Sequence, residues 1–244
     1  MSKFSIIIIT LNEEKNLPNL LNDLKNQSFQ NFEVIISDAN SIDKTIDISN
    51  TYRSDFKSLK TVITEQKGLS LGRNKGEEIA ISENLIFLDA DSRIRTDFLS
   101  KLDSILKQNQ VDVGGVYMDV STGTKTERFV SFIFNAGLWI TKWFFPTIIG
   151  ACIISTKTAH NKIGGFNVEL DINEDVEYSK KAYQHPEVKF QMLPLSFIFN
   201  MRRLAQNGYF KTIYGYTKYN IYRFLFGEIK KGTVKYDFGN DNDK

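Results

Sequence analysis

The sequence predicts an α/β protein built on a mostly parallel sheet with helices on both faces. In the first half, short apolar runs alternate with helical segments of about ten residues, which is the pattern of parallel βαβ units. The runs are continuously apolar, as expected for strands that are buried on both faces. With 244 residues and 41% hydrophobic residues, the chain is long enough to bury a sizeable core.

The first half divides into strands and helices in strict alternation. Residues 4–10 are β-branched and apolar, and leucines then recur at helical spacing between residues 17 and 24. The predicted strands cover residues 4–10, 33–37, 59–64 and 85–89. The predicted helices cover residues 12–27, 43–52 and 70–81.

After about residue 110 the alternation ends, and we expect the second half to pack onto the open edge and top of the first. The predicted elements are a strand over 111–120, an aromatic helix over 129–145, a strand within 146–155 and a helix over 173–184. The predicted core face of this last helix is Ile172, Val176, Ser179 and Tyr183. One domain is expected over 1–200, with halves 1–110 and 111–200, followed by a basic aromatic helix and tail over 201–244.

The charge distribution argues against a general nucleic-acid-binding role. Although the net charge is +2, residues 202–235 hold eight Lys or Arg and one Glu, so this segment carries +7 and the rest is net acidic. Such asymmetry favours a local contact with a phosphate group or an anionic surface. The single cysteine, Cys152, and a start without the features of a secretory signal predict a reducing, cytoplasmic location.

Polar residues cluster where the predicted strands end. They are Thr10, Asn12 and Glu13 after the first strand, Asp38 after the second, and Asp89 and Asp91 after the fourth. Parallel sheets bind ligands beyond these carboxyl ends. The two carboxylates of Asp89-Ala90-Asp91 suit Mg²⁺ or Mn²⁺, which could hold a leaving diphosphate. The alternative is a strand end followed by solvated acids.

Five segments resemble the inverting GT-A glycosyltransferases of family 2, in family order. They are residues 5–13, 33–45, 71–76, 164–167 and 173–178, and the resemblance covers residues 4–184. It implies a GT-A (Rossmann-like) fold with a nucleotide-sugar-binding half over 1–110 and an acceptor-binding half over 111–200. An amphipathic helix would follow at the C-terminus.

The resemblance also implies roles on the donor side. Thr10, Asn12 and Glu13 belong to the nucleotide-contacting turn, and Asp38 accepts a hydrogen bond from the base. Asp91 would bind the metal directly, and Asp89 would contact the ribose or the metal.

Three arginines complete the donor-side predictions. Arg73 could approach the donor phosphates, and Arg202 and Arg203 could bind donor phosphate or the phosphate of a lipid-linked acceptor. The alternatives are a turn-forming role for Asp38 and solvated surface charge for the arginines.

Glu174 and Asp175 are the candidates for the catalytic base. Adjacent residues on a helix point about 100° apart, so only one can face the cleft directly. Asp175 borders the predicted core stripe, whereas Glu174 lies nearly opposite Val176. We therefore predict Asp175 as the general base, with Glu174 supporting the site or contacting the acceptor. The alternative is that both acids only stabilise the first turn of the helix.

The resulting hypothesis is a metal-dependent glycosyltransferase that uses a nucleotide-diphospho-sugar, with UDP favoured over GDP, and a glycan or lipid-linked acceptor. The alternatives are transfer to a polyprenyl phosphate and a catalytically silent nucleotide-sugar-binding module. Residues 209–226 have a basic amphipathic pattern, which predicts peripheral association with the inner face of the plasma membrane. This segment could instead pack on the catalytic domain.

Overall fold

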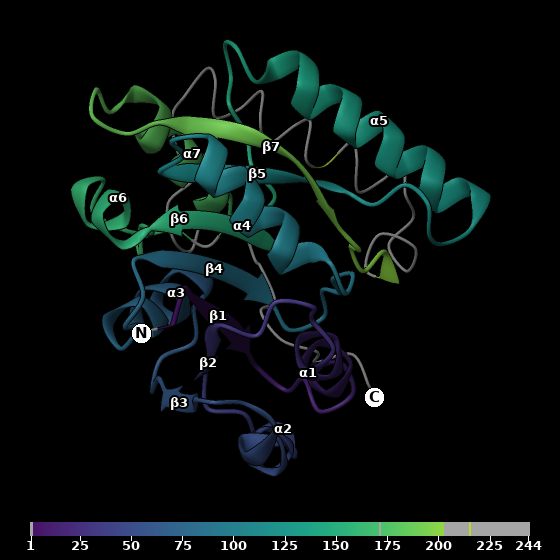
Figure 1. The fold of residues 1–244 in the computed structure, drawn as a ribbon, viewed down its shortest axis with the longest axis vertical. Coiled ribbons are helices and arrows are strands. Elements are labelled where there is room, and N and C mark those ends of the chain that lie inside the picture. The colour runs from purple at the N-terminus through teal and green to yellow at the C-terminus, as the bar shows by residue number, and fades with distance from the viewer. Residues whose placement is uncertain (1, 171, 203–214, 216–244) are drawn as a thin grey trace.

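The structure is a computed structural model that describes residues 2–170, 172–202 and 215. Its strands form one sheet (Figure 1). The strands are β1 (Phe4–Thr10), β2 (Phe32–Asp38), β3 (Leu59–Ile63), β4 (Asn84–Asp89), β5 (Val113–Met118), β6 (Cys152–Thr156) and β7 (Phe190–Phe197). The helices are α1 (Leu17–Lys25), α2 (Thr45–Thr51), α3 (Leu69–Glu78), α4 (Phe98–Gln108), α5 (Lys125–Thr141), α6 (Lys157–Lys162) and α7 (Glu174–Gln184), and a 3₁₀ turn covers Arg53–Asp55.

The sheet order is β3-β2-β1-β4-β6-β5-β7. Neighbouring strands from β3 to β4 are parallel, β6 runs antiparallel to both β4 and β5, and β5 and β7 are parallel. The prediction of a mostly parallel sheet is therefore confirmed. The second half continues the sheet from the β4 edge, as expected.

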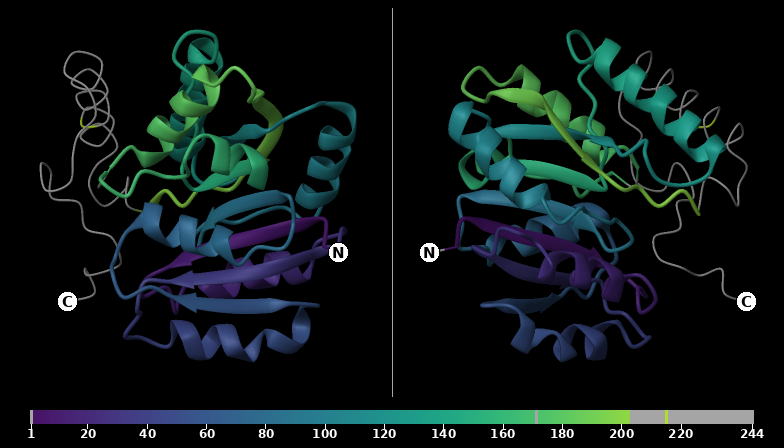
Figure 2. Two further views of the ribbon diagram at one scale, coloured as in Figure 1. Left: turned by 90° about the vertical axis from the view of Figure 1, so that its left-hand side faces the viewer. Right: turned by 45° about the vertical axis from the view of Figure 1, so that its right-hand side comes forward.

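Helices cover both faces of this sheet (Figure 2). Side chains alternate along β1, so that Ile6 and Ile8 join a core with α1, α4 and α5, while Ile7 joins a second core with α6 and α7. Helix α3 packs on the same face as Ile7. Burial on both faces explains why the strands read as continuous apolar runs.

Several element boundaries differ from the predictions. Helix α1 begins at Leu17 rather than Asn12, because Asn12 has a φ of 55° and lies in a turn bonded to the loop after β2. Helix α5 begins at Lys125 rather than Phe129, because Thr124 and Glu127 form a capping box. Helices α4 and α6 and strand β7 were not predicted. The predicted C-terminal amphipathic helix lies outside the described residues, among which no helix is long and apolar enough to cross a membrane.

Close packing of α3 on β1 predicts the effect of Gly76→Ala. A Cβ at Gly76 would lie 2.3 Å from Cγ2 of the buried Ile7. We expect the free energy of unfolding to fall by about 1–3 kcal/mol, because the helix must move away from the sheet.

Gly137→Ala in α5 is the matched control, since nothing lies within 4 Å of its added Cβ. This substitution should instead stabilise the protein by about 0.5–1 kcal/mol through helix propensity. Urea unfolding of both variants measures the difference, and equal effects would contradict the packing described for Gly76.

Candidate functional site

Asp38 joins the ends of β1 and β2. Its Oδ2 accepts hydrogen bonds from Thr10 Oγ1 at 2.6 Å and Ser41 Oγ at 2.7 Å, and its Oδ1 accepts one from Ser41 N at 2.7 Å. The carboxylate is fully buried. Since a carboxylate has about four acceptor positions, three protein donors leave room for one more hydrogen bond. Asp38 therefore has a structural role, and because its side chain is inaccessible, a ligand can reach the remaining acceptor position only if the surrounding loops move.

Asn12 and Glu13 connect the loop after β1 to the loop that leads into α2. Asn12 N donates to Ser41 Oγ at 2.8 Å, and Asn12 Oδ1 accepts from Ile42 N at 3.0 Å. Glu13 N donates to Thr45 Oγ1 at 2.8 Å, while its carboxylate accepts from Asn16 Nδ2 at 2.6 Å. These bonds fix the two loops relative to each other at the carboxyl edge of the sheet.

Arg73 connects three elements at the end of β4. Its side chain is 1% exposed. Nη1 donates to Glu174 Oε1 at 2.7 Å, and Nη2 donates to Asp89 Oδ1 at 3.2 Å and to Gly150 O at 3.0 Å. Desolvation lowers the pKa of Arg73, but attraction to Glu174 and Asp89 outweighs it and raises the pKa overall. The sequence predicted an approach to donor phosphates, whereas the structure directs the guanidinium to protein acids.

The glycines of α3 explain how Arg73 reaches this position. Gly72 and Gly76 lie where a Cβ would be 3.2 Å and 2.3 Å from the side chains of Ile9 and Ile7. Because the two glycines have no side chain, helix α3 can lie close to β1. Arg73 follows Gly72 on this helix and is therefore also held close to the sheet. The glycine spacing is therefore part of what places the guanidinium inside the protein.

Asp175 is held at the start of α7 by two backbone amides. Its Oδ2 accepts from Gly150 N and its Oδ1 from Val176 N, both at 2.8 Å. Desolvation and then repulsion from Glu174 raise the pKa of Asp175 to about 7, although Arg73 acts in the opposite direction. A carboxyl group with a pKa near neutrality suits proton transfer.

The predicted core face of α7 was partly wrong. Glu174, which was expected nearly opposite Val176, is buried against Arg73. Tyr183 was expected in the core and is 47% exposed, while Tyr178 is buried instead. The prediction placed Glu174 by its angle from Val176 alone, but a buried arginine from α3 provides a partner for Glu174.

Aromatic packing holds α7 in place through Tyr178. The Tyr178 ring stacks on Phe166 with centroids 4.1 Å apart, and the Tyr178 hydroxyl bonds Ser155 Oγ at 2.8 Å and His160 Nδ1 at 3.1 Å. The Arg73 guanidinium carbon lies 5.1 Å from the Phe166 ring centroid. Desolvation lowers the pKa of His160 to about 4, so this ring is neutral at physiological pH.

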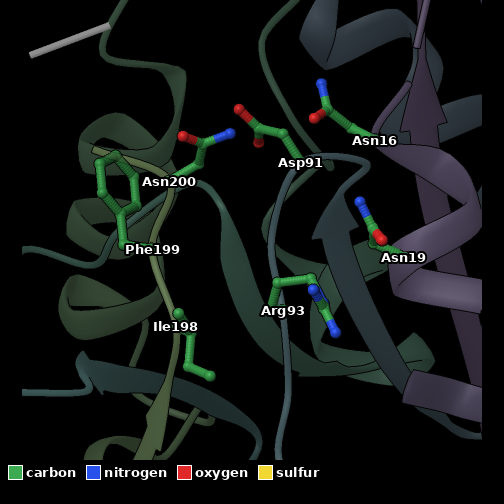
Figure 3. A pocket seen from close by; sticks show the side chains of 7 residues that line it. All are labelled: Asn16, Asn19, Asp91, Arg93, Ile198, Phe199 and Asn200. Atoms are coloured by element: carbon green, nitrogen blue, oxygen red, sulfur yellow. The ribbon is translucent and has the colours of Figure 1, made fainter. Parts of the chain in front are cut away.

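A cavity of about 180 Å³ lies beside Asp91 (Figure 3). Its lining residues are Asn16, Asn19, Asp91, Arg93, Ile198, Phe199 and Asn200. Arg93 donates to both oxygens of Asp23, at 2.5 and 2.6 Å, so its charge is balanced within the protein. Arg202 N donates to Asn200 Oδ1 at 3.0 Å, which places Arg202 next to this cavity, while Arg203 lies outside the described residues.

The donor set of this region fits a hard divalent cation with few protein ligands. No cluster of three or more His, Cys, Asp or Glu suited to a metal occurs within the described part of the chain. Asp89 and Asp91 could supply carboxylate oxygens, and phosphate or water oxygens would complete the coordination, as is usual for Mg²⁺.

Some residues of the site carry little or no signal in the sequence. Gly150 bonds both Arg73 and Asp175 through its backbone, so no side-chain chemistry could have signalled it. Asn16, Asn19 and Asn200 line the cavity but belong to no recognised motif. Asn74 lies in the segment after Gly72 and exchanges two hydrogen bonds with the Phe166 backbone, at 2.8 and 2.9 Å.

Comparison with known proteins places the chain in a family. The family model described as glycosyl transferase family 2 matches residues 5–172. Cholesterol galactosyltransferase of Borreliella burgdorferi is 29% identical over 111 residues, which cover 46% of this chain and 31% of that protein. The chain thus spans less than a third of this relative.

Solved structures share the fold. Staphylococcus aureus TarS 1-349 in complex with UDP-GlcNAc matches with a TM-score of 0.63 and 25% identity, covering 80% of this chain and 57% of that one. The mannosyltransferase PcManGT of Pyrobaculum calidifontis, in complex with GDP-Man and Mn²⁺, matches with a TM-score of 0.65 and 18% identity, covering 81% and 56% of the two chains. Both confirm the predicted GT-A-like α/β architecture.

The buried ion pairs predict that Arg73→Met is strongly destabilising. Glu174 would be left buried beside an apolar side chain, which should lower the free energy of unfolding by about 3–5 kcal/mol. Adding Glu174→Gln removes the uncompensated charge and should recover most of the loss. Urea unfolding of the single and double variants distinguishes the cases, and equal losses would contradict a dominant Arg73–Glu174 pair.

Proposed function

The chain belongs to glycosyl transferase family 2, and we propose that it is a metal-dependent inverting glycosyltransferase acting from a nucleotide-diphospho-sugar. One observation carries the proposal. Arg73 contacts both Asp89, beside the candidate metal ligand Asp91, and Glu174, beside the candidate base Asp175. The groups needed at the leaving diphosphate and at the acceptor are thereby held through one guanidinium.

The proposed reaction is a single displacement at the anomeric carbon. Asp175 accepts the proton of the acceptor hydroxyl, and the hydroxyl oxygen forms a bond to the anomeric carbon. The bond from that carbon to the diphosphate breaks on the opposite face, and the nucleoside diphosphate leaves with the electron pair. A bound Mg²⁺ or Mn²⁺ would neutralise the charge that develops on the leaving group.

Each polar residue of the site then has a defined task. The Gly150 amide orients the Asp175 carboxylate, and Arg73 fixes Glu174 and Asp89. Arg73 is therefore proposed as a positioning residue rather than a direct phosphate ligand. Asp91 would bind the metal. Arg202, beside the cavity, remains a candidate for phosphate contact, as does Arg203.

The nucleotide would lie against the loops after β1 and β2. Thr10, Asn12, Glu13 and Asp38 form this braced edge, and the base would reach the fourth acceptor position of the buried Asp38 once the loops around it move. TarS binds UDP-GlcNAc and PcManGT binds GDP-Man with Mn²⁺, which supports a nucleotide-sugar donor of this kind. We propose UDP over GDP, as the sequence predicted.

The proposed acceptor is a glycan or a lipid-linked molecule, in assembly of a cell-surface glycan. A relative named as a cholesterol galactosyltransferase supports an acceptor in a membrane. In this proposal residues 1–110 bind the donor, residues 111–200 bind the acceptor, and the basic segment 201–244 contacts an anionic membrane.

The raised pKa of Asp175 predicts the pH dependence of transfer. Because the base acts deprotonated, kcat/KM should rise about tenfold per pH unit below pH 7 and level off above it. Asp175→Asn should reduce kcat by a factor of about 10²–10⁴ without loss of donor binding. A flat pH profile, or full activity in this variant, would reject Asp175 as the base.

Although Asp175→Asn should lower activity, it should raise stability at alkaline pH. The pKa of Asp175 is about 7 in the folded state, against an ordinary value of 3.8. Between these two values the unfolded chain loses the proton more readily than the folded protein, so the free energy of unfolding falls as pH rises from about 4 to 7. Asp175→Asn should therefore unfold at a higher temperature than the wild type at pH 8. A lower melting temperature at pH 8 would contradict the raised pKa.

Donor binding should depend on metal through Asp91. Thermal unfolding with UDP- and GDP-sugars, with and without Mn²⁺, should show a shift for one nucleotide class that requires the metal, since a ligand of the folded state stabilises it. Asp91→Asn should abolish the metal-dependent part, while Asp97→Asn, which removes a surface partner of Lys101, should not. Donor binding without turnover on any acceptor would favour the silent-module alternative.

A further inference from the structure

One face of α5 and of the turn after it exposes an aromatic surface. Figure 1 shows α5 at the periphery of the molecule, beside β5 and β7. Its exposed apolar side chains have between 50% and 72% of their surface accessible. They are Phe129, Phe132, Ile133, Trp139, Ile140, Trp143 and Phe144, and we call them the α5 outer face. At about 100° per residue they occupy an arc of about 140° on one side of the helix.

The opposite side of α5 fixes its orientation. Val130 and Leu138 are buried in the core. The Asn135 side chain accepts a hydrogen bond from Met118 N at 2.9 Å and donates one to Met118 O at 2.8 Å. Because these contacts prevent the helix from rolling, the outer face cannot be buried by a rotation of α5.

The charges around the outer face are positive. Lys142 lies with its Nζ 5.4 Å from the Trp139 ring centroid and 4.8 Å from that of Trp143. Lys125 and Arg128 are exposed at the other end of the helix. The single acid of α5, Glu127, is used in the capping box at its N-terminus. Apolar aromatic surface bordered by Lys and Arg is the composition of helices that lie in a membrane interface.

We propose that the α5 outer face binds the surface of an anionic phospholipid bilayer, with its aromatic side chains at the boundary between headgroups and acyl chains. The basic residues would contact lipid phosphates, and the +7 charge of residues 202–235 would add attraction to the same surface. The 17-residue helix would lie along the interface, since no described helix is long and apolar enough to cross a membrane.

Membrane contact at α5 would deepen the proposed function, on which this step rests. Tyr183 Oη of α7 donates to Trp143 O at 2.9 Å, and Ser179 Oγ of α7 donates to Pro146 O at 3.0 Å. Farther along the same segment, Gly150 N donates to Asp175 Oδ2 at 2.8 Å. The chain from Trp143 to Gly150 thus connects the outer face to the candidate base, so docking would bring the acceptor side to a lipid-borne acceptor.

The two tryptophans of the chain, Trp139 and Trp143, both belong to the outer face and report directly on docking. The full chain is mixed with vesicles of phosphatidylcholine alone or with phosphatidylglycerol, including brominated lipids. We expect a blue shift and bromine quenching of tryptophan fluorescence with the anionic vesicles, and weaker binding at high salt. Binding through residues 201–244 alone would leave the tryptophans unquenched and would overturn the proposal.

A variant that retains both reporters tests the apolar contact. Phe132→Gln with Ile140→Gln should weaken vesicle partitioning by about tenfold or more, because two apolar side chains that would become buried in the bilayer are replaced by polar ones. The control is Ile63→Gln with Ile81→Gln. It removes two apolar side chains that are 56% and 55% accessible, about as exposed as Phe132 and Ile140, and that do not belong to the α5 outer face. Circular dichroism checks that both variants fold.

The remaining outcomes distinguish the proposals. Docking would be overturned if the wild type and the α5 variant partition equally onto vesicles. It would also be overturned if light scattering shows that the wild type and the control variant are dimers whereas the α5 variant is a monomer. Donor binding is measured on the same samples by thermal shift. Vesicle binding without donor binding would support docking and reject the proposed function, whereas donor binding without vesicle binding would reject docking alone.

Discussion

The buried guanidinium of Arg73 is the interaction on which the rest of the site depends. Moving an arginine out of water is unfavourable by several kcal/mol unless it is paired, and here Glu174, Asp89 and the Gly150 carbonyl provide the partners. One positive charge is shared between two carboxylates. Burial raises the pKa of the nearby Asp175, repulsion from Glu174 raises it further, and Arg73 offsets only part of this rise.

Sheet topology explains how the second half of the chain contributes to this site. Strand β6 runs antiparallel to β4, so the start of β6 lies at the carboxyl end of β4. Asp89 N donates to Ala151 O at 3.1 Å, and the adjacent Gly150 reaches both Arg73 and Asp175. If β6 were parallel to β4, its carboxyl end rather than its start would lie at the carboxyl end of β4. One reversed strand thus brings backbone from the second half of the chain to the sheet edge where the strands of the first half end.

Local sequence patterns predicted the features that local physics determines. The apolar runs identified β1 to β4, and the acids after β4 were recognised because strand ends meet at one edge of a parallel sheet. Predictions failed where a distant residue decides the outcome. Glu174 is buried because Arg73, 101 positions earlier, neutralises it. The start of α1 depends on Asn12 bonding to the loop of Ser41, and Gly150 acts only through its backbone.

Two places in this protein depart from what stability alone favours, and one segment joins them. Asp175 is an acid held where its charge is unfavourable, and the α5 outer face leaves aromatic side chains in water although Val130, Leu138 and Asn135 already fix the helix. Polar residues at the outer positions would leave those inner contacts unchanged. Packing among the residues that the structure describes therefore explains neither feature. Departures of this kind are expected at functional surfaces. Because residues 143–150 bond to α7 at both ends, one hydrogen-bonded segment connects the exposed face to the candidate base.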